Sequence, residues 1–193
     1  MLISFYIADE CWFCLSNPRL AKHLIVAVGN ECYVTLPKGQ IHATHGDDAT
    51  PLVPGGGHVL IVPIAHYPTL ASLAPDIGGS VLDEVAQHKR ALSALFAKQG
   101  AVPVFIETAR ISAKGGHAHV QAVPIPRAMA ARVREEFERA GKVQGVEFAE
   151  DVQGALEACA SGTRSYFRVD LPDGEKMVAV LRDGVHFNLQ FGR

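Results

Sequence analysis

The 193-residue chain lacks several features that would place it in a special class of protein. No apolar run reaches the roughly 18 residues that a membrane-spanning helix needs, so we expect no membrane association. The opening segment MLISFYIADE has no basic residue and ends on two acidic ones, unlike a secretory signal peptide. Four cysteines in a chain of this length do not form a disulfide framework, which favours a reducing compartment such as the cytosol or the nucleus.

An excess of charge of one sign is also missing. The 18 basic and 20 acidic side chains leave a formal net charge of -2, so the chain is not a simple polycation. Any nucleic-acid partner must therefore be held by a local basic patch. Residues 110–134 contain basic residues and no acidic one, and we predict that these basic residues bind phosphates: Arg110, Lys114, Arg127, Arg132 and Arg134. A solvated helix face is the alternative for the 127–134 part.

The composition that is present, 48% hydrophobic and 20% charged, indicates a folded core. Strand patterns occur at 24–28, 32–36, 58–63, 102–107, 117–123, 166–171 and 176–181. Helical patterns begin at Asp76 or Ser80 and stop at Gly100, and occur again at 128–140 and 152–160. This order predicts an α+β fold with one antiparallel sheet and helices packed on it. The proline-rich stretch 124–127 suggests a boundary between residues 1–126 and residues 127–193.

The segment His117-Ala118-His119-Val120-Gln121 carries the clearest chemical pattern. On a strand, alternate side chains share a face, so His117, His119 and Gln121 are expected in one row above an apolar face. Such a row suits phosphate chemistry, in which one imidazole attacks phosphorus and its neighbours hold the oxygens. The preceding Gly115-Gly116 pair would let a ligand approach the backbone closely. An edge strand with two solvated histidines is the alternative.

A second pattern is the C-x-x-C pair of Cys11 and Cys14. Two thiolates at this spacing fit one tetrahedral metal ion, and two reduced structural cysteines are the equal alternative. His66 follows the strand 58–63 between two prolines, where it is either a ligand or a surface turn residue. Cys32 and Cys159 lie in apolar periodic segments and are expected in the core.

Longer runs of the sequence resemble a known family. CWFCLSNP (11–18), KHLIVAVGNECYVTLPKG (22–39), HVLIVPIAHYPTL (58–70) and GGHAHVQAVPIP (115–126) are similar to the first C-terminal domain of CwfJ-type splicing factors. SYFRVDLPDGEKM (165–177) and FNLQFGR (187–193) resemble the second C-terminal domain of the same family. The resemblance covers nearly the whole chain apart from residues 40–57 and about 141–160.

The resemblance implies a histidine-triad (HIT-like) fold and allows its extension by a second half-domain in the same chain. It also implies a nuclear RNA-processing role in the spliceosome or in intron-lariat turnover. The expected partners are RNA, including branched lariats, and either spliceosomal proteins or the lariat-debranching enzyme. Members of the debranching branch carry a metallophosphoesterase-like domain before this region, and the family continues past the QFGR segment. The chain therefore looks like an excised C-terminal portion, and a monomer is expected if its second half supplies the sheet that other histidine-triad proteins obtain by dimerising.

The resemblance also implies roles for individual residues. Histidine-triad enzymes use the middle histidine of their motif as nucleophile, which corresponds to His119, and Gln121 takes the third position as in galactose-1-phosphate uridylyltransferases. Zinc-bearing members of the superfamily imply a Cys2His2 zinc site formed by Cys11, Cys14, His66 and His117. This assignment moves His117 from phosphate contact to metal binding. CwfJ relatives vary at these histidines, so two functions stay open: an RNA-binding module and an active nucleotidyl hydrolase or transferase. A third alternative is a scaffold with a purely structural zinc site.

Overall fold

The computed structural model describes residues 10–41, 51–73, 75–111, 116–182 and 187–192. Its strands are β1 (Ile25–Val28), β2 (Cys32–Thr35), β3 (Val59–Pro63), β4 (Ala101–Ala109), β5 (Val120–Pro126), β6 (Tyr166–Asp170) and β7 (Lys176–Val180). Its α-helices are α2 (Pro75–Ala97), α3 (Val133–Gln144) and α4 (Val152–Cys159), and 3-10 turns occur at η1 (Lys22–Leu24) and η2 (Arg127–Arg132). In the described ranges, no helix is long and apolar enough to cross a membrane.

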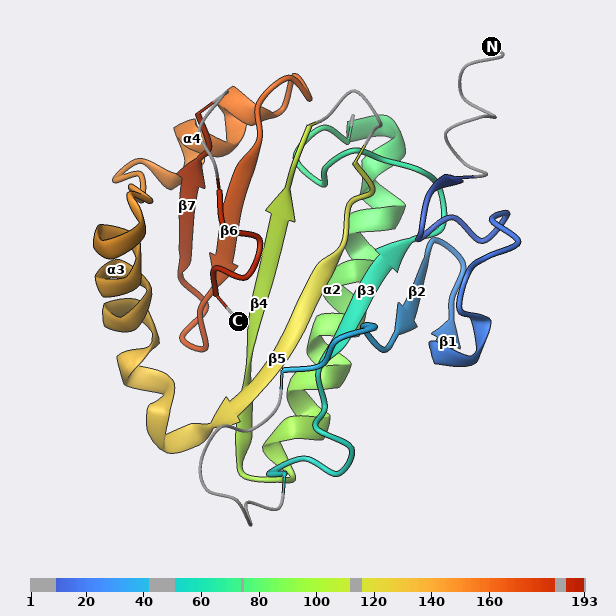
Figure 1. Ribbon diagram of the computed structural model, residues 1–193, viewed down its shortest axis with the longest axis horizontal. Helices are drawn as coiled ribbons and strands as arrows, with labels where there is room; N and C mark the ends of the chain where they lie inside the picture. The colour runs from blue at the N-terminus through green and yellow to red at the C-terminus, as the bar shows by residue number, and fades with distance from the viewer. Residues whose placement is uncertain (1–9, 42–50, 74, 112–115, 183–186, 193) are drawn as a thin grey trace.

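All seven strands form one antiparallel sheet in the order β1-β2-β3-β5-β4-β6-β7 (Figure 1). The C-terminal hairpin β6–β7 joins the sheet through β4, with Phe105 opposite Asp170 and Ala109 opposite Tyr166. The second half of the chain thus extends the sheet of the first half. The predicted α+β class with an antiparallel sheet is confirmed, whereas the boundary at residue 126 stays a prediction.

The two faces of the sheet are covered by different parts of the chain. Phe105 points into the apolar cluster under α2, while its neighbours Val104 and Ile106 point into the cluster under α3. The short helix α4 packs on the same face as α2, against Ala109, Tyr166 and the hairpin. The opposite face is covered by the N-terminal segment over β2 and β3, and by α3 with residues 187–191 over β4 and β6. This second face carries the candidate site.

Two predicted boundaries are wrong by a few residues. Strand β5 begins at Val120 rather than at residue 117, because the Ala118 N–H bonds to the Tyr67 carbonyl oxygen of a loop instead of to a strand. The expected helix 128–140 begins as the 3-10 turn η2, and α3 continues through Gly141 to end at Gly145. Gly145 adopts a φ of 70°, which a glycine accepts readily. Gly141 lies in the helix, where a Cβ atom would come within 2.7 Å of the Val146 carbonyl oxygen.

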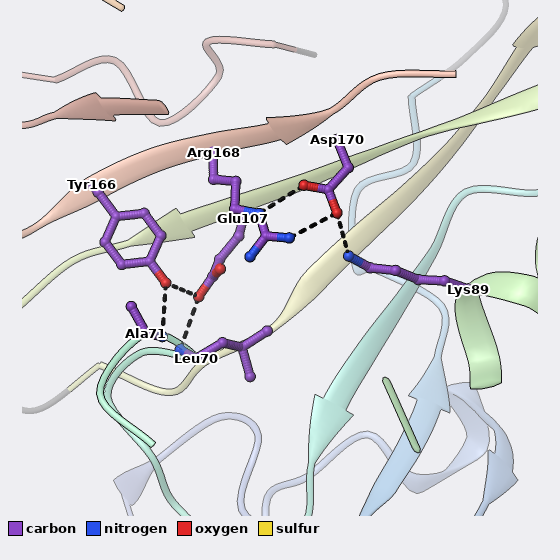
Figure 2. A network of polar contacts seen from close by, with 7 residues as sticks. All are labelled: Leu70, Ala71, Lys89, Glu107, Tyr166, Arg168 and Asp170. Carbon is purple, nitrogen blue, oxygen red and sulfur yellow. Dashed lines mark hydrogen bonds and ion pairs between the residues drawn. The ribbon is translucent and has the colours of Figure 1, made fainter. Parts of the chain in front are cut away.

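A buried polar network joins the two halves of the chain between α2 and α4 (Figure 2). Glu107 of β4 accepts hydrogen bonds on Oε1 from the Leu70 N–H at 3.0 Å and from the Tyr166 hydroxyl at 2.7 Å. On β6, Asp170 binds the guanidinium of Arg168, and it also accepts from the Lys89 Nζ of α2 at 2.7 Å. Because its members come from α2, β4, β6 and the loop at residue 70, the network fixes the C-terminal hairpin to the rest of the fold.

Candidate functional site

The structure brings the C-x-x-C pair together with two distant histidines. The Cys11 Sγ lies 3.3 Å from His117 Nδ1, and the Cys14 Sγ lies 3.2 Å from His66 Nδ1 and 3.6 Å from His117 Nδ1. One potential ligand atom from each of the four residues lies within 4.8 Å of every other. Four sulfur and nitrogen donors at these separations suit a single tetrahedral metal ion such as zinc.

The backbone around the two cysteines is fixed by neighbouring side chains. Asn17, which is buried, donates to the Cys11 carbonyl oxygen at 2.7 Å and accepts from the Arg19 N–H at 2.8 Å. The Tyr33 hydroxyl of β2 donates to the Phe13 carbonyl oxygen at 2.7 Å, and the Phe13 N–H lies 3.5 Å from the Cys11 Sγ. The loop from residue 11 to residue 17 therefore has a defined position on the sheet.

The protonation of the two histidines also favours metal binding. The His117 Nε2 lies 2.9 Å from the Pro63 carbonyl oxygen, to which it donates, so Nδ1 is left unprotonated and faces the thiols. Burial lowers the pKa of His117 to about 4; the hydrogen bond to Pro63 opposes this lowering, and the nearby His66 and His119 add to it. Burial also lowers the pKa of His66. Neutral imidazoles are the form that binds metal, and a carbonyl behind the ring orients it.

His119 and Gln121 lie beside this cluster on the same face of the sheet. The Nδ1 of His119 donates to the His117 carbonyl oxygen at 3.0 Å, so Nε2 is the unprotonated nitrogen. Burial lowers the pKa of His119, which keeps the imidazole neutral near pH 7. The Ile41 N–H donates to His58 Nδ1, so His58 Nε2 carries the proton and donates to Gln121 Oε1 at 3.2 Å. The carboxamide oxygen of Gln121 thus accepts a hydrogen bond from His58. Among the described residues no partner is found for its NH2 group, which can donate to a ligand.

The side chains of His119 and Gln121 line a cavity of about 450 Å³ on this face of the sheet. Its floor is formed by the sheet, including Leu60 and Thr108, and residues 36–39 and the C-x-x-C loop form one wall. Leu189 and Gln190, from the C-terminal segment, line it as well. The volume lies within the ~300–1,000 Å³ range of small-molecule sites. Both halves of the chain therefore contribute to one site that offers a neutral imidazole, an amide donor and a guanidinium, since Arg110 also lines it.

The structure separates the predicted basic residues. Arg110 is exposed and lines the cavity, and Lys114 lies outside the described residues, as does Gly115. Arg127 and Arg132 belong to η2 and Arg134 to α3, and none of these three lines the cavity. Arg132 pairs with Glu136, and Arg134 pairs with Glu175 and, more distantly, with Glu138.

One glycine of the motif has a structural explanation. A Cβ atom on Gly116 would come within 2.5 Å of the Arg110 carbonyl oxygen and 3.3 Å of the Pro68 carbonyl oxygen. The chain's own backbone therefore makes a close approach at this position. It places Arg110 directly beside the start of the histidine motif.

Several residues of the site were not predicted from the sequence. Phe13 stacks on the ring of His119, with centroids 4.8 Å apart and an angle of 29° between the rings. Trp12 and Lys38 stand together at the rim, and His58 orients Gln121. Phe13 and Trp12 sit inside the C-x-x-C pair, so their position next to a predicted metal site was a usable signal. The pairings of Lys38 and His58 depend on the fold and had no local signal.

The protein is thus an α+β domain with a Cys2His2 cluster beside a histidine-lined cavity. The family model described as "Protein similar to CwfJ C-terminal" matches residues 4–138, and the chain belongs to this CwfJ family. The family predicted from the sequence motifs is thereby confirmed.

Individual relatives agree with this assignment. The chain is 38% identical over 185 residues to the CWF19-like protein mug161 of Schizosaccharomyces pombe, which covers 95% of this chain and 31% of that protein. It is 35% identical over 186 residues to CWF19-like protein 1 of Xenopus laevis, with 95% of this chain and 30% of that protein covered. The chain thus spans less than a third of these relatives. A solved galT-like protein from Arabidopsis thaliana superposes with a TM-score of 0.42 at 12% identity, covering 82% of this chain and 76% of that one.

Proposed function

We propose that this chain is an RNA-processing domain of a splicing-related nuclear factor, and that it binds RNA phosphates in the cavity lined by His119 and Gln121. Membership of the CwfJ family and the CWF19-like relatives support the splicing role. The cavity supports the ligand, because the amide NH2 of Gln121 and the Arg110 guanidinium can both donate hydrogen bonds to phosphate oxygens. This convergence of two donors on one cavity is the observation that carries the proposal.

Zinc is the metal that we propose for the Cys2His2 cluster. Two thiolates and two imidazoles are its usual structural donor set, and all four residues are used, which leaves no open position for a substrate. The ion would tie the N-terminal loop of residues 11–14 to the strand ends that carry His66 and His117. On this view its contribution is to hold the cavity wall in place.

We propose spliceosomal proteins or the lariat-debranching enzyme as protein partners, and a monomer as the state of the chain itself. The second half of the chain supports the monomer, because β6 occupies the edge of β4 that a second copy would otherwise need. Branched intron RNA is the proposed RNA partner, since lariat turnover is implied by the family resemblance.

The phosphate site is tested by RNA binding as a function of salt. Each phosphate contact in single-stranded RNA contributes about 0.7 to the slope of log affinity against log salt concentration. Arg110→Ala is expected to lower the slope by about that amount. Arg132→Ala is the matched control, because its guanidinium already pairs with Glu136 away from the cavity. Equal slopes for the wild type and Arg110→Ala would contradict the proposal, and a larger loss for Arg132→Ala would contradict it by placing the RNA at η2.

Nucleotidyl transfer through His119 is a second candidate, favoured by its hydrogen bond to the His117 carbonyl oxygen. That bond keeps the proton on Nδ1 and leaves Nε2 with its lone pair. In this reaction Nε2 attacks the α-phosphorus of a nucleoside polyphosphate, the N–P bond forms and the bond to the leaving phosphate oxygen breaks. Water then breaks the N–P bond to release the nucleotide, and the proton that water loses balances the one taken up by the leaving group.

The adduct itself is the test of this chemistry. Mass spectrometry after incubation with a dinucleoside polyphosphate or capped RNA is expected to show one nucleotidyl group on the wild type and none on His119→Asn. No adduct on the wild type, or an equal amount on the variant, would remove the enzymatic candidate. Neither result affects the salt-dependence test, so binding and catalysis are judged separately.

A further inference from the structure

Trp12 is the chain's one tryptophan, and it is unusually exposed. Its side chain is 68% exposed although it lies in the fixed loop between Cys11 and Cys14. Its neighbour Phe13 points the other way, into the apolar cluster of Tyr33, Leu60 and Val62. Tryptophan is normally largely buried, and an indole that is held in water is characteristic of binding surfaces.

The backbone on both sides of Trp12 is held by hydrogen bonds. The Cys11 carbonyl oxygen is held by Asn17, and the Phe13 carbonyl oxygen is held by the Tyr33 hydroxyl. In the part of the chain that the structure describes, no hydrogen-bond partner is found for the Trp12 indole N–H. An exposed aromatic ring on a fixed backbone suits a planar ligand, because the loop that carries it loses little freedom on binding.

Lys38 places a positive charge against the same ring. Its Nζ lies 4.1 Å from the centroid of the Trp12 ring, and both residues line the cavity that contains His119, Gln121 and Arg110. One part of the cavity rim is thus apolar and aromatic. Another part carries the Gln121 amide and the Arg110 guanidinium, which can donate hydrogen bonds to a phosphate. A nucleotide has the same division between a flat base and a charged phosphate.

We propose that Trp12 and Lys38 form a nucleobase-binding site, in which a base of RNA stacks on the indole while its phosphate lies among His119, Gln121 and Arg110. The inference rests on the proposed function and adds the class of ligand at the rim: a base recognised by its π-face. Such stacking tolerates any of the four bases, because each has a π-face. Lys38 contributes a positive charge beside the Trp12 ring and a further contact for the phosphate backbone of the RNA.

The single tryptophan makes the test direct, because all indole fluorescence comes from Trp12. The purified chain is titrated with AMP, with ribose 5-phosphate, which lacks the base, and with adenosine, which lacks the phosphate. AMP is expected to quench the fluorescence and to bind roughly 5- to 150-fold more tightly than ribose 5-phosphate, the usual contribution of one stacked base. Ribose 5-phosphate is expected to bind with little quenching.

Two variants complete the experiment, with binding measured by calorimetry because they lack the tryptophan. Trp12→Ala is expected to lose the preference for AMP over ribose 5-phosphate, and Trp12→Phe is expected to keep most of it. Equal affinities of the wild type for AMP and ribose 5-phosphate overturn the base site and leave the phosphate site intact. Quenching by adenosine together with no binding of ribose 5-phosphate keeps the base site and overturns the phosphate site. Unchanged AMP binding by Trp12→Ala overturns the base site and leaves the indole as a contact for a protein.

Discussion

Replacement of Tyr166 by phenylalanine should weaken the buried network that joins the two halves of the chain (Figure 2). The hydroxyl of Tyr166 makes two hydrogen bonds: it donates to Glu107 Oε1 at 2.7 Å and accepts from the Ala71 N–H at 3.1 Å. Without it, Glu107 keeps only the Leu70 N–H on this oxygen, and its Oε2 already has no partner among the described residues. Each buried group left without a partner costs about 1–3 kcal/mol, so we expect a loss of about 3 kcal/mol in the free energy of unfolding.

The measurement is urea and thermal unfolding followed by far-ultraviolet circular dichroism. For a domain of this size, about 3 kcal/mol corresponds to a fall in Tm of roughly 6–12 °C. Tyr67→Phe is the matched control, since in the described structure no hydrogen bond of its hydroxyl is found, and its effect should stay within about 0.5 kcal/mol. If both variants lose the same stability, the Tyr166 hydroxyl does not stabilise the network, and the network does not hold the two halves of the chain together.

Two further changes test the network and the loop. Burial raises the pKa of Glu107 above its ordinary 4.5, so the folded chain keeps this proton at pH values where the unfolded chain has lost it. The wild type should therefore lose stability relative to Glu107→Gln as the pH rises above about 4.5, and a pH-independent difference in unfolding free energy would contradict this. Asn17→Ala removes the hydrogen bonds to Cys11 and Arg19, and should cost about 1–3 kcal/mol of stability. The zinc affinity of the Asn17→Ala variant, measured by competition with a chelator, should fall roughly 10- to 100-fold. An unchanged affinity would show that Asn17 does not hold the Cys2His2 cluster in place.

The elements of the fold were largely predictable, because local patterns determine them. The strand patterns at 24–28, 32–36 and 102–107 predicted β1, β2 and β4, and all three strands are present. The start of β5 was not predictable, because the bond from Ala118 to Tyr67 that keeps residues 117–119 out of the sheet joins segments about fifty residues apart in sequence. The same holds for the buried network, in which Lys89 and Asp170 are 81 residues apart.

The candidate site divides in the same way. The motifs at Cys11 and His119 are visible as spacing, and the family resemblance supplied the remaining ligands that the structure brings together. The basic stretch does not line the cavity as a whole, and phosphate binding by its members stays a prediction. Arg110 faces the cavity, whereas Arg134 pairs with Glu175, 41 residues away. The partner of a charged side chain is decided by the tertiary fold, and sequence alone gives only its sign.

The proposed RNA site in the cavity is tested most directly by mapping where RNA contacts the chain. Single-stranded RNA containing 4-thiouridine is cross-linked to the protein by ultraviolet light, and the modified peptides are identified by mass spectrometry. We predict cross-links in the cavity walls, in residues 12–13, 36–39, 116–121 and 189–190. Cross-links confined to η2 and α3, at residues 127–144, would show that RNA binds these two helices and would contradict RNA binding in the cavity.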